Sequence, residues 1–538
     1  MSARTVDVVR GVVLPRPDGS LTSPQDVLLD GGRLRAVERS SHRRGGTVLD
    51  GGGRLVLPGF VDAHVHGGAA VLEPEVQHAL LRQGITAIVT GADGVGYAPS
   101  DRTSAAWAGR YFAGIDGEHP RFDGGSVAEL LAGYDGTIPV SVAALVPHGT
   151  LRRTVVGVDR RPATPAETAT MVALARQGLA DGAVGLSTGF EYVPAAWAHE
   201  DELRAVVAVA AEHGLPHVSH MRGYEDRAVP ALEELLRLAA ATGAATHVSH
   251  LHGPAAPIVA LLDAARTAGT DVTFDSYPYL RGCSLLSMVA LPTWLPLADP
   301  DATAAALDAP AHARRLRAHL DELAGLWPRV TLAWVPGLAP HEGDVAGRAL
   351  VDVAARWGVP PSEAALRILR ASRLRASCVF AQPPTGTAAA VRALANHPAH
   401  LAGSDAIYQP VGAAATEGRP HPRGWGAFAR FLAEHVRGTG DWTWHDAAEH
   451  LSGRAARRFA LAGRGRVAPG AVADLVLVDP DAVADRATYE APRAPAFGID
   501  DVLVAGQPVL AGGELTGARP GRGLWAAAAT RPQERSPS

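Results

Sequence analysis

Short apolar segments alternate with helical segments over the middle of the chain, and polar residues follow most of the apolar segments. Helical patterns such as Asp201–His213 and Ala231–Thr242 lie between the apolar segments. Eight strands with intervening helices predict an α/β fold, a (β/α)8 TIM-like barrel with its active site at the carboxyl ends of the strands. The expected strands or strand ends are Gly59–His66, Ile85–Thr90, Pro139–Val146, Ala183–Leu186, Pro216–His220, Ala245–His250, Asp271–Phe274 and His400–Ala402.

The two ends of the chain have a different pattern from the middle. Residues 1–57 and 464–524 contain short strands between Gly and Pro turn signals, which predicts a small β-sandwich domain built from both termini. The barrel would then span residues 58–463. Residues from about 284 to 344 break the alternation, and we expect an insertion there that covers the barrel mouth. We expect residues 525–538 to be a disordered tail.

Charge and cysteine content restrict the class of protein. A net charge of −5 argues against a nucleic-acid partner and against a basic membrane patch. Two cysteines, Cys283 and Cys378, exclude a disulfide scaffold and a zinc site made of four cysteines. Arg10 interrupts the first apolar stretch before it reaches signal-peptide length, and no run of 18 apolar residues occurs. We therefore expect a cytoplasmic protein without a membrane partner.

The chain contains no lysine, so all 50 basic residues are arginine. Lysine is required for Schiff-base chemistry, for bound pyridoxal phosphate and for a P-loop. A carboxylated lysine that bridges two metals is excluded for the same reason.

One short motif indicates metal binding. Asp62, Ala63, His64, Val65 and His66 follow one another directly after an apolar segment. Residues i and i+2 of a strand share a face, so His64 and His66 point the same way. Taken alone, this pair is equally compatible with two hydrogen-bonded histidines in a core.

Other polar residues at predicted strand ends strengthen the metal hypothesis. His220 and His250 end consecutive predicted strands 30 residues apart, and Asp405 follows the last barrel strand. Four histidines and an aspartate at the ends of four strands predict a metal centre. Nitrogen and carboxylate ligands fit Zn²⁺ best, with one or two ions, and Mn²⁺ or Co²⁺ as alternatives.

These residues, together with several longer segments, resemble the amidohydrolase superfamily, and within it the N-acyl-D-amino-acid deacylases, or D-aminoacylases. The resemblance extends over nearly the whole chain, including the C-terminal run from Gly470 to Leu524. The segments that carry it are Pro58–His66, Gly182–Gly189, Ser219–Arg222, Tyr277–Tyr279, Gly403–Asp405, His421–Gly426, Ala473–Val476 and Arg519–Arg522.

The resemblance implies a role for each site residue. His64 and His66 bind one metal position, and His220 and His250 bind the other. Asp405, also a metal ligand, is the general base that takes a proton from the metal-activated water. Arg423 would hold the substrate carboxylate, with help from Tyr192 and Tyr277. The chemistry is consistent with these roles, because a metal activates water and polarises a carbonyl, while arginine binds a carboxylate with two parallel hydrogen bonds.

The chain departs from the family pattern at three positions. Asp93 stands where the deacylases have a cysteine ligand, and we expect it to be a metal ligand or a bridge between two metals. His252 stands where the family has a lysine that contacts substrate. Cys283 stands where the family tends to have a serine near the substrate. These differences concern substrate binding more than the reaction.

The leading hypothesis is therefore metal-dependent hydrolysis of N-acyl-D-amino acids, or of a related N-acylated amine, to a carboxylate and a free amine. One alternative is a hydrolase or deaminase of a cyclic amide, similar to dihydroorotases and hydantoinases. A less favoured alternative is a non-catalytic scaffold. The sequence leaves open the acyl group, the side chain, the preference for D or L substrates, the number of metals and the oligomeric state.

Overall fold

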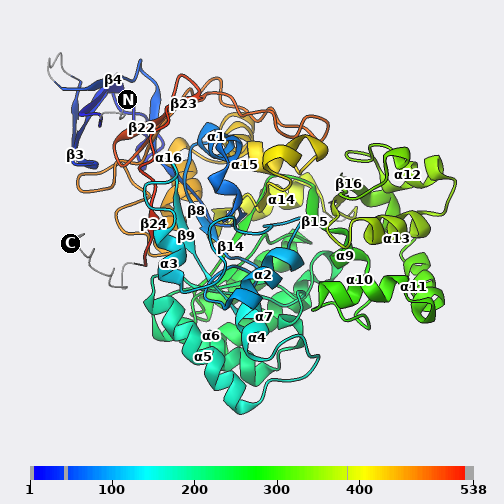
Figure 1. Ribbon diagram of the computed structural model, residues 1–538. Helices are drawn as coiled ribbons and strands as arrows, with labels where there is room; N and C mark the ends of the chain where they lie inside the picture. The colour runs from blue at the N-terminus through cyan, green and yellow to red at the C-terminus, as the bar shows by residue number, and fades with distance from the viewer. Residues whose placement is uncertain (1–4, 41–45, 385, 527–538) are drawn as a thin grey trace, which may run out of the picture.

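A computed structural model describes residues 5–40, 46–384 and 386–526 of the chain (Figure 1). Residues 527–538, most of the predicted tail, lie outside this part. Ala526, which belongs to the predicted tail, is buried, and its N–H donates a hydrogen bond to the carbonyl of Gly182 at 3.1 Å. None of the described helices is long and apolar enough to cross a membrane.

A six-stranded parallel sheet in the order β10-β11-β12-β13-β14-β18 occupies the centre of the molecule. Apart from Thr273, every residue of these strands is buried, because helices and loops cover the sheet on both sides. The strands are β10 (Val146–Pro147), β11 (Leu186–Gly189), β12 (His217–His220), β13 (Thr246–Val248), β14 (Val272–Ser276) and β18 (His400–Ala402).

Further parallel strands continue this sheet at both of its ends. One sheet has the order β24-β9-β8-β6, and β19 pairs with β7. Only Leu145 separates β9 from β10, and the N–H of Ala63 donates to the carbonyl of Ala402, the last residue of β18, at 3.2 Å. The strands are β6 (Phe60–Asp62), β7 (Val65–His66), β8 (Ile85–Thr90), β9 (Ser141–Ala144), β19 (Ala406–Ile407) and β24 (Gly523–Leu524).

Helices connect the parallel strands and begin and end at recognisable signals. Thr164 and Glu167 form a capping box at the start of α5, and Gly243 ends α7 with a φ of 70°, a left-handed conformation that favours glycine. The connecting helices are α1 (Pro74–Arg82), α2 (Arg102–Tyr111), α3 (Val127–Ala132), α4 (His148–Val155), α5 (Pro165–Ala180), α6 (Glu200–Glu212), α7 (Ala228–Thr242), α8 (Ala255–Thr267) and α14 (Ala388–Ala395). Helices α15 (Arg423–Phe431), α16 (Trp444–Ala448) and α17 (Arg454–Arg458) follow β19.

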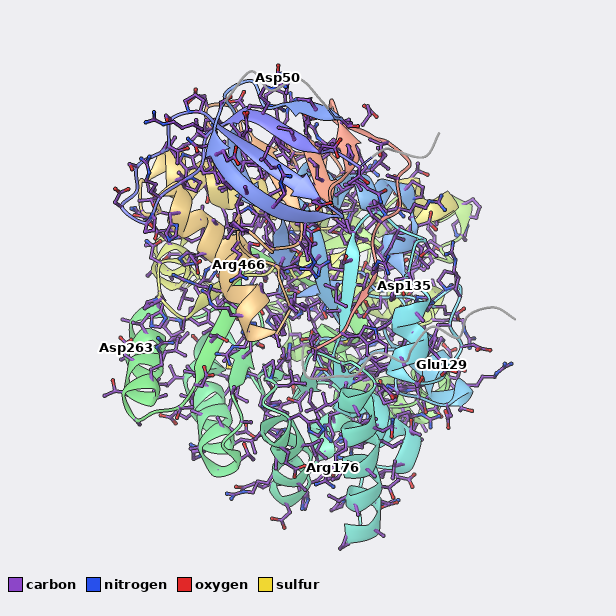
Figure 2. All side chains as sticks on the ribbon, turned by 90° about the vertical axis from the view of Figure 1, so that its left-hand side faces the viewer. Asp50, Glu129, Asp135, Arg176, Asp263 and Arg466 are labelled. Atoms are coloured by element: carbon purple, nitrogen blue, oxygen red, sulfur yellow. The ribbon has the colours of Figure 1, made fainter. Side chains whose placement is uncertain are left out.

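Strands from the two termini form two further sheets that share one apolar cluster, with members such as Val9, Val27, Val56 and Leu475. In Figure 2 the N-terminal sheet, marked by Asp50, lies at the opposite end of the molecule from Arg176 of α5. The first sheet has the order β3-β2-β1-β4, with β1 (Val8–Val12), β2 (Gln25–Asp30), β3 (Arg33–Arg39) and β4 (Val48–Asp50). The second has the order β23-β22-β21-β20-β5, with β5 (Leu55–Pro58), β20 (Leu475–Val478), β21 (Ile499–Val504), β22 (Gln507–Ala511) and β23 (Glu514–Leu515).

The segment between β14 and α14 forms a separate unit with an apolar core of its own. Its antiparallel sheet has the order β15-β17-β16, and its helices α10 to α13 lie on the side of the molecule away from the terminal sheets (Figure 1). The sheet extends to Ala381, beyond the predicted boundary near residue 344. Its elements are β15 (Arg281–Leu285), α9 (Leu286–Ala290), α10 (Pro300–Asp308), α11 (Pro310–Glu322), β16 (Val330–Trp334), α12 (Leu350–Trp357), α13 (Pro361–Ala371) and β17 (Ser377–Ala381).

The fold thus confirms the predicted α/β class, and both termini contribute strands to one region as predicted. The predicted strands differ from the observed ones mainly at their ends. For example, the expected strand Ala183–Leu186 is β11, which runs from Leu186 to Gly189.

Candidate metal centre and active site

Six residues at or just beyond the ends of parallel strands form one buried group, which we call the His–Asp cluster. They are His64, His66, Asp93, His220, His250 and Asp405, the six residues that the sequence predicts as metal ligands. His64 lies between β6 and β7, and His66 ends β7. Asp93 follows β8, His220 ends β12, His250 follows β13 and Asp405 follows β18. Each is at most 7% exposed.

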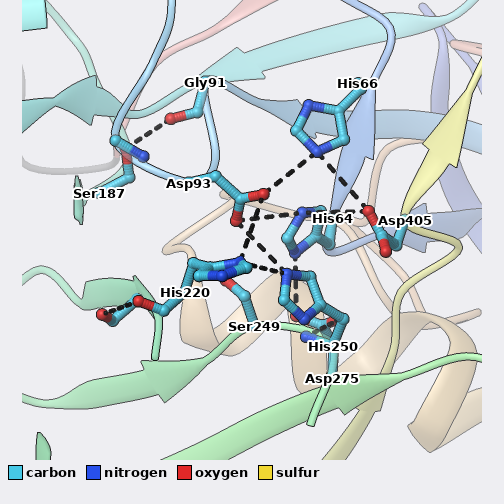
Figure 3. Close-up of polar contacts among 12 residues, drawn as sticks. His64, His66, Gly91, Asp93, Ser187, His220, Ser249, His250, Asp275 and Asp405 are labelled. Atoms are coloured by element: carbon cyan, nitrogen blue, oxygen red, sulfur yellow. Dashed lines mark hydrogen bonds and ion pairs between the residues drawn. The ribbon is translucent and has the colours of Figure 1, made fainter. Parts of the chain in front are cut away.

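Asp93 lies at the centre of the cluster, between the imidazole rings (Figure 3). Its Oδ1 is 3.7 Å from His64 Nε2 and 3.6 Å from His250 Nε2. Its Oδ2 is 3.4 Å from His66 Nε2 and 3.8 Å from His220 Nδ1. One carboxylate therefore faces all four histidines, with a different oxygen toward each pair.

Asp405 approaches the cluster from the other side of the two N-terminal histidines. Its Oδ1 is 3.7 Å from His64 Nε2 and 3.6 Å from His66 Nε2. Two groups of donor atoms result, one of His64, Asp93 and His250 and one of His64, His66 and Asp405, and within each group all donor atoms lie within 4.8 Å of one another.

The donor spacing fits a metal ion. With bonds of about 2.0–2.2 Å, two ligands of a tetrahedral zinc ion lie about 3.3–3.6 Å apart, close to the separations of 3.4–3.8 Å around Asp93. In addition, the buried atoms His64 Nε2 and Asp93 Oδ1 have no hydrogen-bond partner within the described part of the chain. Buried polar atoms rarely lack a partner, so this arrangement fits cation binding.

Acidic residues outside the cluster orient three of the imidazoles. His66 Nδ1 donates to Asp116 Oδ2 at 3.2 Å, and His220 Nε2 donates to Glu191 Oε2 at 3.0 Å. Because the outward nitrogen of each neutral ring carries the proton, the nitrogen that faces the cluster is unprotonated. His64 Nδ1 lies 3.5 Å from Asp275 Oδ2. Such outer partners fix the tautomer and orientation of metal-binding histidines.

Asp275 has the most connections among these outer carboxylates. It accepts hydrogen bonds from His247 Nε2 and from the backbone N–H of His250, both at 2.9 Å. Asp116, Glu191 and Asp275 are absent from the sequence prediction. Asp275 directly follows the predicted strand that ends at Phe274 and is fully buried, but its partners come from other parts of the chain.

The backbone is strained at three members of the cluster. Asp93, His250 and Asp405 have φ values of 59°, 35° and 49°, in a region that non-glycine residues seldom occupy. Gly94 follows Asp93 in a tight turn, and a Cβ at this position would lie 2.7 Å from the backbone nitrogen of Gly189. Strain of this kind occurs where a fold holds functional side chains in place.

Burial and charge shift the pKa values of the cluster in opposite directions. Burial alone would lower the pKa of His64, but the carboxylates of Asp275 and Asp93 raise it to about 9. Burial alone would raise the pKa of Asp93, but the surrounding histidines, His64 first, hold it well below its usual value. Without a cation the cluster therefore retains protons on imidazole and keeps Asp93 ionised.

Asp62 fixes the loop that carries Asp405. Its carboxylate accepts hydrogen bonds from the Ser404 hydroxyl at 2.5 Å and from the backbone N–H of Ser404 at 2.9 Å. The backbone N–H of Asp405 in turn donates to the carbonyl of His64 at 2.8 Å. Burial raises the pKa of Asp62 to about 7, against these hydrogen bonds.

A cavity of about 870 Å³ opens onto the cluster. Of the predicted substrate residues, Tyr192, Tyr277, His252 and Cys283 line this cavity. The His252 ring stacks on Tyr224 at 4.7 Å between ring centroids, and burial lowers the pKa of His252 to about 4. Position 252 therefore presents an uncharged ring to the cavity at neutral pH.

Arg423, the fifth predicted substrate residue, is fully buried behind the cavity wall. Its Nη1 lies 2.8 Å from Asp405 Oδ2, and its guanidinium carbon lies 4.5 Å from the centre of the Tyr277 ring. Its three side-chain nitrogens make no hydrogen bond to any described residue. The guanidinium thus keeps unused donors beside the cluster.

Comparison with known proteins places this chain among hydrolases. The model of a family described as Amidohydrolase family matches residues 47–510. The chain is 32% identical over 496 residues to the N-acyl-D-glutamate deacylase of Alcaligenes xylosoxydans xylosoxydans, and the match covers 90% of this chain and 89% of that protein. It is 31% identical over 521 residues to the D-aminoacylase of the same organism, with 94% and 95% covered.

A solved structure agrees with these relatives. The N-acyl-D-glutamate deacylase from Bordetella bronchiseptica matches with a TM-score of 0.79 and 30% identity, over 97% of this chain and 100% of that one. That structure contains zinc and a phosphonate inhibitor that mimics the tetrahedral intermediate of its reaction.

Proposed function

This chain belongs to the amidohydrolase family and is a carbon–nitrogen hydrolase related to the D-aminoacylases, and from that premise we propose that it hydrolyses N-acyl-D-amino acids. The products would be a carboxylate and a free D-amino acid. The observation that carries the proposal is the position of Asp93 and Asp405, whose carboxylates lie 3.4–3.8 Å from the inward nitrogens of His64, His66, His220 and His250.

We propose that the cluster holds one or two zinc ions. His64, His66 and Asp405 would hold one position, His220 and His250 the other, and Asp93 would bridge them. When bound, zinc supplies a Lewis acid that polarises the amide carbonyl and makes water a better nucleophile at neutral pH. The lack of lysine leaves Asp93 as the candidate bridge, and its carboxylate lies within 3.8 Å of a ring nitrogen of each of the four histidines.

Asp405 is the proposed general base. Its Oδ1 faces His64 and His66, and the carboxylate lines the cavity, so it can take a proton from an attacking water and pass it to the departing amine. Ser404 and Asp62 hold its loop, and Arg423 keeps a positive charge beside it. These contacts hold the Asp405 carboxylate in position beside the histidines.

Arg423 is the proposed partner of the substrate carboxylate, with Tyr192 and Tyr277 on the cavity wall beside it. Its unused donors and full burial support this role, because a buried guanidinium binds a carboxylate strongly. Arg423 itself does not line the cavity, but its guanidinium lies 4.5 Å from the ring of Tyr277, which does. His252 and Cys283 are proposed to contact the rest of the substrate.

We also propose that the parallel strands close into a (β/α)8 barrel over residues 58–463, and that the terminal sheets form a β-sandwich from residues 1–57 and 464–524. The short link between β9 and β10 and the hydrogen bond from Ala63 to Ala402 support closure of the barrel. The apolar cluster shared by the two terminal sheets supports the sandwich. The cytoplasmic location stays a prediction.

Hydrolysis of a substrate panel by zinc-reconstituted protein tests the proposed function. The panel contains N-acetyl and longer N-acyl amino acids of both D and L configuration, together with a hydantoin and a dihydropyrimidine as cyclic amides. We expect release of D-amino acids that stops with a chelator and returns with zinc. Hydrolysis of the cyclic amides alone would replace this proposal with the cyclic-amide alternative.

An Asp93→Ala variant tests the proposed metal ligands independently of turnover. We expect its zinc content, measured by mass spectrometry after dialysis, to fall well below that of the wild-type protein. Unchanged zinc content would remove Asp93 from the ligand set.

A further inference from the structure

One side of the cavity is apolar and is formed by elements far apart in the sequence. We call it the apolar wall, and it consists of Tyr111, Ile115, Tyr192, Cys283, Met288 and Ile407, all of which line the cavity. These side chains belong to one apolar cluster, whose interior includes Phe112 and Trp107. Phe112 packs edge to face against Tyr192 at 5.3 Å and stacks on Tyr111 at 5.5 Å, so the wall has a rigid aromatic backing.

The apolar lining continues from this wall into the separate unit. The further lining residues all belong to the unit's own apolar cluster, either in its core or packed against it, and are Val289, Leu291, Leu297, Leu326, Leu374 and Phe380. The cavity therefore extends from the His–Asp cluster to the side chains of a second hydrophobic core.

Four of the five arginines that line the cavity form ion pairs, two of them with acidic residues that also line it. Ion pairs join Arg227 to Glu191 and Arg329 to Glu225, both at 2.8 Å. Two other lining arginines are also paired, Arg222 with Glu234 at 3.0 Å and Arg110 with Asp301 at 3.4 Å. The fifth lining arginine, Arg160, donates to the backbone carbonyl of Thr293 at 2.9 Å. The cavity thus offers little free positive charge for a second carboxylate on the substrate.

The cavity is also much larger than a small N-acetylated amino acid. Ligand pockets of about 300–1,000 Å³ hold drug-sized molecules, so a cavity of about 870 Å³ has room for far more than the roughly nine non-hydrogen atoms of N-acetylalanine. A small substrate would cover only part of this apolar wall and would leave the rest in contact with water.

We infer that the substrate carries an extended apolar chain joined to the scissile amide, and that this chain lies along the apolar wall toward the separate unit. The inference rests on the proposed function and narrows its substrate class. The chain can belong to the acyl group or to the side chain of the amine, and the two sources present the same chemistry to the wall. A second carboxylate on the substrate is disfavoured.

Turnover of a matched series by the zinc-loaded wild-type enzyme tests this inference. The series is N-acetyl-D-alanine, N-decanoyl-D-alanine, N-acetyl-D-2-aminododecanoic acid and N-acetyl-D-glutamate. We expect kcat/KM to rise about tenfold or more from the first compound to the second or the third. A rise with the second compound alone assigns the apolar chain to the acyl group, and a rise with the third alone assigns it to the side chain of the amine. No rise with either, or a preference for the glutamate derivative, overturns the inference.

Binding separates this inference from the proposed function. The same compounds are titrated calorimetrically into the zinc-loaded Asp405→Asn variant, in which turnover is not required. Tighter binding of the long-chain compounds without hydrolysis by the wild-type enzyme supports the inference and contradicts the proposed function. Hydrolysis by the wild-type enzyme, with an affinity that does not depend on chain length, supports the proposed function and contradicts the inference.

A charge on the apolar wall gives a second test. Met288→Glu should lower the ratio of kcat/KM for N-decanoyl-D-alanine to that for N-acetyl-D-alanine, or the corresponding side-chain ratio, by about fivefold or more. Leu280→Glu is the matched control, because Leu280 is 41% exposed and does not line the cavity. Equal ratios in the two variants would overturn the inference, and Met288→Leu should keep the wild-type ratio.

Discussion

The His–Asp cluster and the apolar wall line the same cavity but depend on different parts of the sequence. The cluster comes from residues at the ends of parallel strands, which the alternation of strands and loops brings to one place. The wall combines α2, the loop after β11, β19 and two elements of the separate unit. The comparison suggests that the reaction is set by the barrel-like strands, whereas the substrate is selected by the contact between these strands and the separate unit.

Asp405→Asn should have the largest effect on turnover and none on the wall. The amide keeps the size of the carboxylate but cannot take a proton, so kcat/KM should fall about a thousandfold. The zinc position proposed at His220 and His250 and the preference among bound chain lengths should stay as in the wild-type protein. Steady-state kinetics on the best substrate, with zinc measured in the same samples, checks this prediction, and near-normal turnover would remove Asp405 as the base.

Asp275→Asn tests how far zinc binding by the cluster depends on a carboxylate outside the cluster. Asp275 accepts from His247 and from the backbone of His250, and its charge faces His64. We expect zinc affinity to fall about 10- to 100-fold, as is usual when the outer partner of a metal-binding histidine is lost. Competition with a fluorescent chelator measures this affinity.

Asp263→Asn is the matched control for that experiment. Asp263 also pairs with a histidine, His397 Nε2 at 3.2 Å, but it is an exposed residue of α8 (Figure 2). Its loss should leave zinc affinity unchanged. Equal effects of the two substitutions would mean that Asp275 acts through general stability and not through the ligands.

The difference between the two regions also explains which features could be predicted. Strand periodicity places His64 and His66 on one face, and the predicted strand ends bring His220, His250 and Asp405 near them, whereas Asp93 was identified through the resemblance to the deacylases. Asp275 was missed because its partners His64 and His247 come from other strands. The separate unit was predicted too short because β17 pairs with β15 across more than 90 residues, a contact without a local signal.

A pH series on zinc-free protein would sharpen the comparison, because the cluster and the wall differ in their titratable groups: the pKa of His64 is raised to about 9, and that of Cys283 to about 11. The pKa of His64 is raised from 6.5 to about 9, so its contribution to stability is fully present below pH 6.5 and is lost as the pH rises through about 9. Urea unfolding in the presence of a chelator should therefore show falling stability over this range. His64→Gln should reduce the slope, and a stability that rises over the same range would contradict the prediction.

Cys283→Ser should have the smallest effect, because it changes the wall without adding a charge. Burial raises the pKa of the Cys283 thiol to about 11, so the side chain is a neutral thiol at neutral pH in the zinc-free protein. We expect unchanged zinc content and a change in kcat/KM below about threefold, since the hydroxyl is similar in size but less apolar. The direction of that small change is informative: a greater loss for long-chain than for short-chain substrates would tie position 283 to the wall. A loss of zinc would instead make the Cys283 sulfur a metal ligand, so that one residue would belong to both the cluster and the wall.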